Sequence, residues 1–189
     1  MNRFNLPTIE PIVNAIEEPR ASAELSSAIA NHPLSKTLGQ DFVQMTIDKS
    51  KRYGFPADVL LAQIHQESGG AVQAHGDPKL KNQAYGLGQI RQPALNSVNT
   101  FLSQHKYPAF PSDPSKLNKE QQVEAMLIYQ TQILPKEFKQ LANNRGKEFT
   151  PTLRDILEAY NRGASNVIDS SKSNGYYSKV ISHLSYIPE

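Results

Sequence analysis

A glutamate stands at the end of an apolar helical stripe, where an acidic side chain is unusual. Leu60 and Ile64 precede Glu67 by seven and three residues, so the three side chains share one helix face. Burying an unpaired carboxylate is costly, and the usual outcome is a raised pKa. An acid that keeps its proton near neutral pH can donate it to a leaving oxygen. Glu67 is therefore the first candidate for general acid chemistry, although a glutamate at a helix end also commonly points into solvent.

Glycines after Glu67 give the backbone room to approach a bound molecule. The pair Gly69–Gly70 permits a sharp turn after the helix, which would leave the carboxylate at the rim of a cavity. Gly86 and Gly88 would offer bare N–H and C=O groups to a ligand. Taken alone, this second pair is equally typical of a plain turn.

Histidine and acid pairs occur twice, as His65 with Glu67 and as His75 with Asp77. Metal ligands must converge on one point, but residues two positions apart face different sides of a helix, which separates His65 from Glu67. The sequence contains no cysteine, which excludes disulfides, thiolate metal sites and a cysteine nucleophile. We therefore expect neither a metal site nor a cofactor.

The elements that must position these residues are helices. Pro56 begins the helix that carries Glu67, and Gly69–Gly70 ends it. Thr150 and Pro151 open another helix, because a capping residue is followed by a proline whose missing N–H costs nothing there. Its apolar residues recur at the spacing of one helix face: Leu153, Ile156, Leu157, Tyr160.

The same signals predict the remaining helices. They are expected over 37–53, 94–104, 119–134, 136–143 and 176–184. Asn118 is the expected cap of the third of these, and Pro135 is expected to end or kink it. Residues 71–90 have the composition of a loop, and strand signals are nearly absent. The sequence therefore predicts a mostly α-helical fold.

Length and composition indicate one globular domain with a short extension. The chain has 189 residues, of which 38% are hydrophobic and 20% charged, which is ordinary for a soluble protein. Residues 1–36 contain four prolines and room for short helices only, and form the expected N-terminal extension. Residues 37–189 form the expected domain.

Charge and hydropathy exclude some classes of partner. The net charge of +2 is too small for a nucleic-acid-binding face. No run approaches the ~20 apolar residues that a membrane span needs. The first twenty residues carry prolines and acids where an export signal needs an apolar run, so we expect synthesis in the cytoplasm without a signal peptide.

Several segments, in this order, resemble the motifs of soluble lytic transglycosylases. Residues 64–70 (IHQESGG) are similar to the glutamate-serine motif, and 84–90 (AYGLGQI) to the Gly-Leu-Met-Gln-Ile motif. Residues 157–163 (LEAYNRG) resemble the Ala-x-Tyr-Asn-Ala-Gly motif, and 176–180 more weakly resemble a tyrosine-valine segment near the domain end. The resemblance implies the lysozyme-like α-helical fold shared with goose-type lysozymes, in glycoside hydrolase family 23.

The resemblance also implies roles for the first two motifs. Glu67 matches the sole essential acid and base of the family. Ser68 is expected to help orient the substrate or the carboxylate. Gly86 and Gln89 are expected to line the groove, where backbone and amide groups bind N-acetyl sugars.

The later motifs supply the aromatic part of the implied site. Tyr160 matches a tyrosine whose hydroxyl sits near the catalytic glutamate, and Asn161 is expected to support it. Tyr176 is expected to contact sugar or to wall the groove. Two residues depart from the family pattern: Gly88 replaces the methionine of the second motif, and Arg162 replaces the alanine of the third.

The implied reaction cleaves the β-1,4 bond between N-acetylmuramic acid and N-acetylglucosamine in peptidoglycan. In the preferred route Glu67 acts as acid and then as base, the substrate's acetamido group assists, and a 1,6-anhydro-muramoyl end forms. The alternative is hydrolysis, as in goose-type lysozymes, with Asp77 as a second carboxylate. The other aspartate of those lysozymes is replaced by Arg91, and Asp77 before Pro78 is also typical of a plain turn.

A further alternative is a structural protein without catalysis. In this interpretation the lysozyme-like domain binds glycan inside a phage virion or a secretion apparatus, and residues 1–36 dock a partner there. Because an export signal is not visible, we expect even an active enzyme to be delivered to the cell wall by such a particle or machine.

Overall fold

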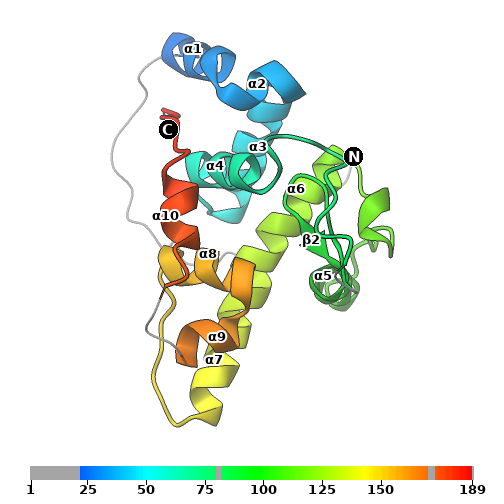
Figure 1. Ribbon diagram of the computed structural model, residues 1–189, viewed down its shortest axis with the longest axis vertical. Coiled ribbons are helices and arrows are strands. Elements are labelled where there is room, and N and C mark those ends of the chain that lie inside the picture. Colours follow the sequence, from blue (N-terminus) through cyan, green and yellow to red (C-terminus); the bar gives the residue numbers. More distant parts are fainter. Residues whose placement is uncertain (1–21, 80–81, 170–172, 189) are drawn as a thin grey trace.

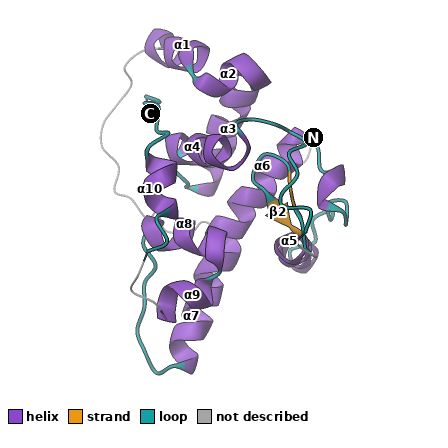
Figure 2. Cartoon of the chain, in the orientation of Figure 1, coloured by secondary structure: helices purple, strands orange, loops and turns teal. Residues whose placement is uncertain are grey.

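The computed structural model describes residues 22–79, 82–169 and 173–188 (Figure 1). In these ranges the elements are α1 Ser22–Asn31, α2 Pro33–Leu38, α3 Gln40–Tyr53, α4 Ala57–Ser68, β1 Ala84–Tyr85, β2 Ile90–Arg91, α5 Gln92–Gln104, η1 Pro114–Lys116, α6 Lys119–Ile128, η2 Tyr129–Ile133, α7 Leu134–Asn144, α8 Leu153–Arg162, α9 Ala164–Asp169 and α10 Tyr176–Ile181. The mostly α-helical fold predicted from the sequence is confirmed (Figure 2).

The helices pack around a long central rod. The rod is formed by α6, η2 and α7, which follow one another without a break and cross much of the molecule (Figure 1). α3 packs on α6, α5 on η2, and α9 on α7, while α10 lies against both α4 and α8. The two helices that carry the first and third motifs, α4 and α8, are therefore joined through the C-terminal α10.

The apolar stripes seen in the sequence form the core. Leu60 and Ile64 of α4 are completely buried, and so is Leu157 of α8. At about 25 cal/mol per Å² of apolar surface, each such side chain contributes roughly 1.5–3 kcal/mol to folding. Gly69 ends α4 with a left-handed backbone (φ 60°), as its place after the stripe predicted.

Pro135 does not end the rod, which continues into α7 after a local change of helix type. Asn118 caps α6 as predicted, in a capping box with Gln121. Five residues of π-helix, Tyr129–Ile133, then precede the proline. Proline lacks an N–H and its ring crowds the carbonyl four residues earlier, so a wider turn lets the helix continue.

The structure also differs from prediction at α8, at α10 and in the loop 71–90. α8 is capped by Thr152 rather than Thr150, because Thr152 and Asp155 bond each other's backbone N–H groups in a capping box. α10 ends at Ile181, shorter than the 176–184 predicted. The predicted loop 71–90 contains part of a small antiparallel hairpin, in which Ala84 pairs with Arg91. Strands of two residues leave no periodic signal in a sequence.

The described part of the N-terminal region packs against the domain. Ile29 of α1 and Leu34 of α2 belong to the same apolar core as α3 and α4. The expected boundary at residue 36 falls inside α2. Residues 1–21 lie outside the described residues. No helix among the described residues is long and apolar enough to cross a membrane.

A buried histidine of this N-terminal region lies within electrostatic reach of His65 on α4. His32 is 3% exposed and caps α2, where its Nδ1 accepts a hydrogen bond from the Leu34 N–H at 3.2 Å. Its Nε2 has no hydrogen-bond partner among the described residues. Burial, and secondarily the charge of nearby His65, lowers the pKa of His32 below its ordinary value of 6.5. His32 is therefore neutral in the folded protein at neutral pH.

We predict that His32 destabilises the fold as the pH falls. Since the unfolded chain binds the proton more readily than the folded one, stability is complete above about pH 6.5 and declines below it. In His32→Asn the cap is retained and the titration is removed. Thermal unfolding at about pH 7.5 and about pH 5 should show a smaller drop in Tm for this variant than for the wild type. An equal drop in both would contradict the prediction.

Candidate active site

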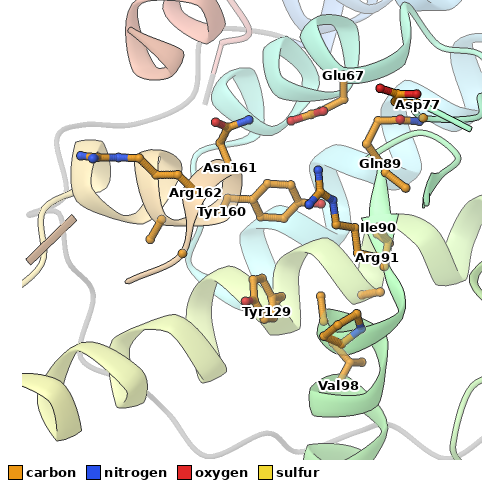
Figure 3. A pocket seen from close by; sticks show the side chains of 17 residues that line it. Glu67, Asp77, Gln89, Ile90, Arg91, Val98, Tyr129, Tyr160, Asn161 and Arg162 are labelled. Atoms are coloured by element: carbon orange, nitrogen blue, oxygen red, sulfur yellow. The ribbon is translucent and has the colours of Figure 1, made fainter. Parts of the chain in front are cut away.

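A cleft of about 560 Å³ opens between the end of α4, the hairpin and α8 (Figure 3). Its floor is formed by residues of α5, α6 and the π-helix. The lining residues are Glu67, Gly76, Asp77, Ala84, Gln89, Ile90, Arg91, Pro93, Ala94, Val98, Ala125, Tyr129, Ala159, Tyr160, Asn161, Arg162 and Gly163. The cleft thus brings together residues of all three main motifs, among them Glu67, Gln89, Tyr160 and Asn161.

Glu67 occupies the last turn of α4 and is held by a short chain of hydrogen bonds. The hydroxyl of Tyr176, on the first turn of α10, donates to Glu67 Oε1. The buried amide of Gln63, one turn earlier on α4, donates to that same hydroxyl oxygen at 3.2 Å. Tyr176 is itself only 5% exposed. The carboxylate is therefore fixed through one of its oxygens, and the side chain lines the cleft.

The surroundings of Glu67 favour its protonated form. Burial raises the pKa of this carboxyl, while the hydrogen bond from Tyr176 and the positive charge of Arg91 oppose the rise without cancelling it. The pKa values of the Tyr160 and Tyr176 hydroxyls are also raised, chiefly by burial and then by the charge of Glu67. Both tyrosines are thus neutral donors at neutral pH, and Glu67 has the character of a general acid.

Tyr160 faces the cleft but does not hold Glu67. Its hydroxyl donates to the Gly88 carbonyl oxygen at 2.7 Å, which fastens α8 to the hairpin. The ring of Tyr129 meets the Tyr160 ring edge-on, with the ring centroids 5.9 Å apart. The resemblance implied a hydroxyl near the glutamate at position 160, whereas the hydroxyl bonded to Glu67 belongs to Tyr176.

Gly88 is a glycine because α6 fills the space beside it. A Cβ at this position would lie 2.4 Å from Sδ of Met126 and 2.8 Å from the Tyr160 hydroxyl oxygen. Met126 is completely buried. The departure from the family's methionine at this position therefore leaves no gap in the hairpin, since a methionine side chain arrives from another helix.

Gln89 lines the cleft in a constrained conformation. Its backbone is left-handed (φ 48°), which is uncommon for a residue with a side chain. Its amide nitrogen donates to the carbonyl oxygens of Gly86 at 3.0 Å and Ala74 at 3.4 Å. The side chain thus organises the hairpin as well as facing the cleft.

Three predicted site residues, Ser68, Gly86 and Tyr176, lie outside the cleft lining. The Tyr176 hydroxyl binds Glu67, and its contact with sugar stays a prediction from the resemblance. The Ser68 hydroxyl donates to the Ile64 carbonyl oxygen and accepts from the Gly70 N–H, so its hydrogen bonds shape the helix end. Gly86 is buried behind the hairpin, where a Cβ would lie 2.2 Å from Oε1 of Gln122. That oxygen accepts the hydrogen bond of the next backbone N–H, at Leu87. Contact of Ser68 or Gly86 with sugar stays a prediction from the resemblance.

Asn161 contacts the segment before α10, whereas Arg162 makes its polar contacts with residues of α8 and α9. Asn161 Oδ1 accepts from Asn174 Nδ2 at 2.7 Å. Arg162 forms an ion pair with Glu158 at 3.5 Å and donates to the Asn166 carbonyl oxygen. Figure 3 shows the Arg162 side chain directed away from Glu67. The positive charge that the sequence suggested near the groove is thus largely matched within the α8 region.

Asp77 and Arg91 complete the charges that line the cleft. Asp77 is exposed, and its Oδ1 accepts from the Lys79 N–H at 2.9 Å, which is the turn that Asp-Pro predicted. Arg91 extends from the hairpin toward Tyr160 (Figure 3). In the described part of the chain, no group of three or more histidine or acidic side chains converges as metal ligands would.

Comparison with protein families agrees with this geometry. The family model described as the transglycosylase SLT domain matches residues 44–181. The chain belongs to the transglycosylase SLT family. Members of this family generally cleave glycosidic bonds by transglycosylation, and their substrate is peptidoglycan. A search among curated proteins finds no match to the chain.

The SLT domain uses residues that sequence reasoning did not single out. Gln63 precedes Glu67 by four residues, so its place on the same helix face was the one available signal. The sequence contains no such signal for Met126 or Glu158, because their contacts depend on packing between segments distant in the sequence. Arg91 was noted only as a replacement for an aspartate.

We predict that Gly88 and Met126 are energetically coupled. Gly88→Ala overpacks the contact and should destabilise the domain by about 1–3 kcal/mol. Met126→Ala leaves a cavity and should cost roughly 2–5 kcal/mol. In the double variant the added methyl group enters the vacated space, so its total loss should be smaller than the sum of the two. Denaturant unfolding of all four proteins measures this coupling, and strict additivity would refute it.

Proposed function

We propose that this protein is a peptidoglycan lytic transglycosylase. It cleaves the β-1,4 bond between N-acetylmuramic acid and N-acetylglucosamine and leaves 1,6-anhydro-muramoyl ends. Glu67 is its catalytic acid and base. The observation that carries the proposal is a single carboxyl of raised pKa, hydrogen-bonded by Tyr176 at the rim of a cleft large enough for sugar rings.

The distribution of charge favours this reaction over hydrolysis. Among the described residues that line the cleft, only Glu67 and Asp77 carry carboxylates. An inverting hydrolase needs its second carboxylate about 6.5–9.5 Å from the first, on the opposite face of the sugar, to activate water. Asp77 is exposed and accepts a backbone hydrogen bond, and the other position expected for such a base holds the positive Arg91. Hydrolysis by a goose-type lysozyme mechanism is therefore the second candidate.

The proposed reaction balances without water. Glu67 donates its proton to the glycosidic oxygen as the bond to the anomeric carbon breaks. The acetamido oxygen of the substrate attacks that carbon from the other side, so no protein nucleophile is needed. The Glu67 carboxylate then accepts the proton of the muramoyl 6-hydroxyl, whose oxygen closes the anhydro ring and displaces the acetamido oxygen. Glu67 ends the cycle protonated, as it began.

Tyr176 supports both halves of this cycle. Because its hydroxyl donates to Oε1, the transferable proton of the acid resides on Oε2. After that proton has left, the same hydrogen bond stabilises the carboxylate. Burial keeps Tyr176 in its neutral form throughout.

The products decide the reaction. Purified peptidoglycan treated with the protein should yield muramoyl ends lighter by one water molecule than hydrolysed ends. Mass spectrometry of the soluble fragments measures this. Glu67→Gln, with an unchanged circular dichroism spectrum, should lose at least about a hundredfold in rate. Hydrated ends alone would establish hydrolysis instead, and full activity of Glu67→Gln would remove Glu67 from the mechanism.

We also predict the effect of Tyr176→Phe on the pH profile. The hydrogen bond favours the carboxylate, so its loss should raise the pKa of Glu67. Since the reaction begins from the protonated acid, the alkaline limb of kcat/KM should move to higher pH, by roughly half to one pH unit. An unmoved limb would show that the hydroxyl does not act on Glu67.

The alternative without catalysis makes a different prediction for the same experiment. A glycan-binding structural protein would retain peptidoglycan binding and release no fragments at all. Delivery by a phage virion or a secretion apparatus, with residues 1–36 as the docking segment, stays a prediction from the sequence.

A further inference from the structure

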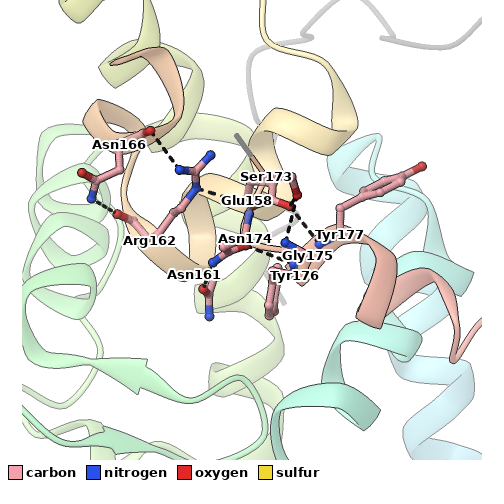
Figure 4. A network of polar contacts seen from close by, with 9 residues as sticks. All are labelled: Glu158, Asn161, Arg162, Asn166, Ser173, Asn174, Gly175, Tyr176 and Tyr177. Carbon is pink, nitrogen blue, oxygen red and sulfur yellow. Dashed lines mark hydrogen bonds and ion pairs between the residues drawn. The ribbon is translucent and has the colours of Figure 1, made fainter. Parts of the chain in front are cut away.

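The buried carboxylate of Glu158, beside the cleft, accepts hydrogen bonds from the segment at the start of α10. Glu158 is 2% exposed, on the face of α8 away from the cleft lining. Its Oε1 accepts from the Ser173 hydroxyl and from the Tyr177 N–H, the latter at 3.2 Å. Its Oε2 accepts from the Asn174 N–H at 3.3 Å. One side chain thus binds three donors of another segment (Figure 4).

These contacts keep the Glu158 carboxyl in its ionised form. Burial works to raise the pKa of this carboxyl, but the hydrogen bonds from Ser173, Tyr177 and Asn174, with the charge of Arg162, lower it overall. The Arg162 guanidinium lies one turn later on α8, 3.5 Å from Oε2. Glu158 is therefore an anion at neutral pH, and an anion strengthens the bonds it accepts from backbone N–H groups.

These contacts surround the residue that touches Glu67. Tyr176 lies between the two backbone donors, Asn174 and Tyr177. Its own N–H donates to Oδ1 of Asn174 at 3.0 Å, and Gly175 turns the chain with φ 80°. The start of α10 is thereby fixed in position and direction. α10 itself has only six residues, too few to hold its place by helix formation alone.

We propose that Glu158 is a positioning residue: its carboxylate fixes the start of α10 and so holds the Tyr176 hydroxyl against Glu67. Glu158 does not touch substrate and acts through Tyr176. The proposal rests on the proposed function of Glu67. It gives the third motif two tasks, because one face of α8 lines the cleft through Tyr160 while Glu158, on another face, orients the acid.

The groups that face Glu67 come from three sides. Tyr176 approaches from α10, Arg91 from the hairpin, and Tyr160 from α8. Loss of Glu158 should release the first of these and leave the other two in place. Loss of Glu158 is therefore expected to raise the pKa of Glu67, as Tyr176→Phe is.

The test is a double-mutant cycle between Glu158→Gln and Tyr176→Phe. The glutamine amide keeps the size of the side chain but places an NH₂ group against the Asn174 N–H or the Tyr177 N–H, so one of these bonds is lost. Alone, Glu158→Gln should move the alkaline limb of kcat/KM upward by roughly half a pH unit and lower kcat by about tenfold. In the Tyr176→Phe background it should add little to the shift.

A second readout does not depend on turnover. The ¹³C resonance of the Glu67 side-chain carboxyl, followed in a pH titration, should report the same upward shift in both single variants. Ser173→Ala is a milder second variant, because it removes the hydroxyl that donates to Glu158 and accepts from the Gly175 N–H, but keeps the two backbone bonds to Glu158. It should shift the titration in the same direction by less.

Glu124→Gln is the matched control. Glu124 also joins two helices, since it accepts from Lys49 at 2.8 Å and from the Tyr53 hydroxyl at 2.9 Å, but it does not line the cleft. It should lower the melting temperature without moving the titration of Glu67. If Glu158→Gln behaves like this control, with lost stability and an unmoved titration, its role is structural and the proposal is overturned.

Failure of the proposed function gives a different result. In that case wild-type protein releases no anhydro ends, or Glu67→Gln remains active. The carboxyl titration still shifts in Glu158→Gln if Glu158 positions Tyr176, and stays unmoved if it does not. The two failures are thus separated by the product spectrum and the NMR titration.

Discussion

The hydrogen bond from Tyr176 to Glu67 joins the first turn of α10 to the last turn of α4, across 109 residues of sequence. A partly buried carboxyl at a helix end is free to rotate unless another group binds one of its oxygens. The packing of α10 against both α4 and α8 supplies that group, the largely buried Tyr176. The acid is therefore a product of the finished tertiary structure. A substitution in α8 or just before α10 would therefore displace the Tyr176 hydroxyl. It would change the surroundings of Glu67 without contacting Glu67 directly.

The local features of the fold were predictable, because they depend on neighbours in the sequence. Proline and glycine gave the ends of α4, and the Asn118 cap gave the start of α6. The failures have two causes. The π-turn before Pro135 and the two-residue strands depend on packing between distant segments, which local propensity does not include. The cap is different, because Thr152 and Asp155 are only three residues apart and their capping box is a local competitor of the Thr150–Pro151 signal.

The site divides in the same way. Glu67, Gln89 and Tyr160 were predictable as cleft residues, since each belongs to a short motif with its own spacing. Which tyrosine binds the acid was not, because Tyr160 and Tyr176 differ only in the distant groups that their hydroxyls reach. The second motif has Gly88 where the family has a methionine. The Met126 side chain of α6 occupies the space beside Gly88 instead, and a comparison of sequences position by position cannot show this.

The electrostatics of the cleft follow from where each charge is matched. Glu158 and Arg162 pair with each other on α8, so this pair adds little net field at the acid. Arg91 has no such partner on its own element and lowers the pKa of Glu67 at a distance, against the larger effect of burial. A positive charge here stabilises the carboxylate form of Glu67. In the proposed reaction, a single carboxyl that is alternately acid and base requires this balance: burial strong enough to keep the proton, and donors close enough to stabilise the carboxylate once the proton has left.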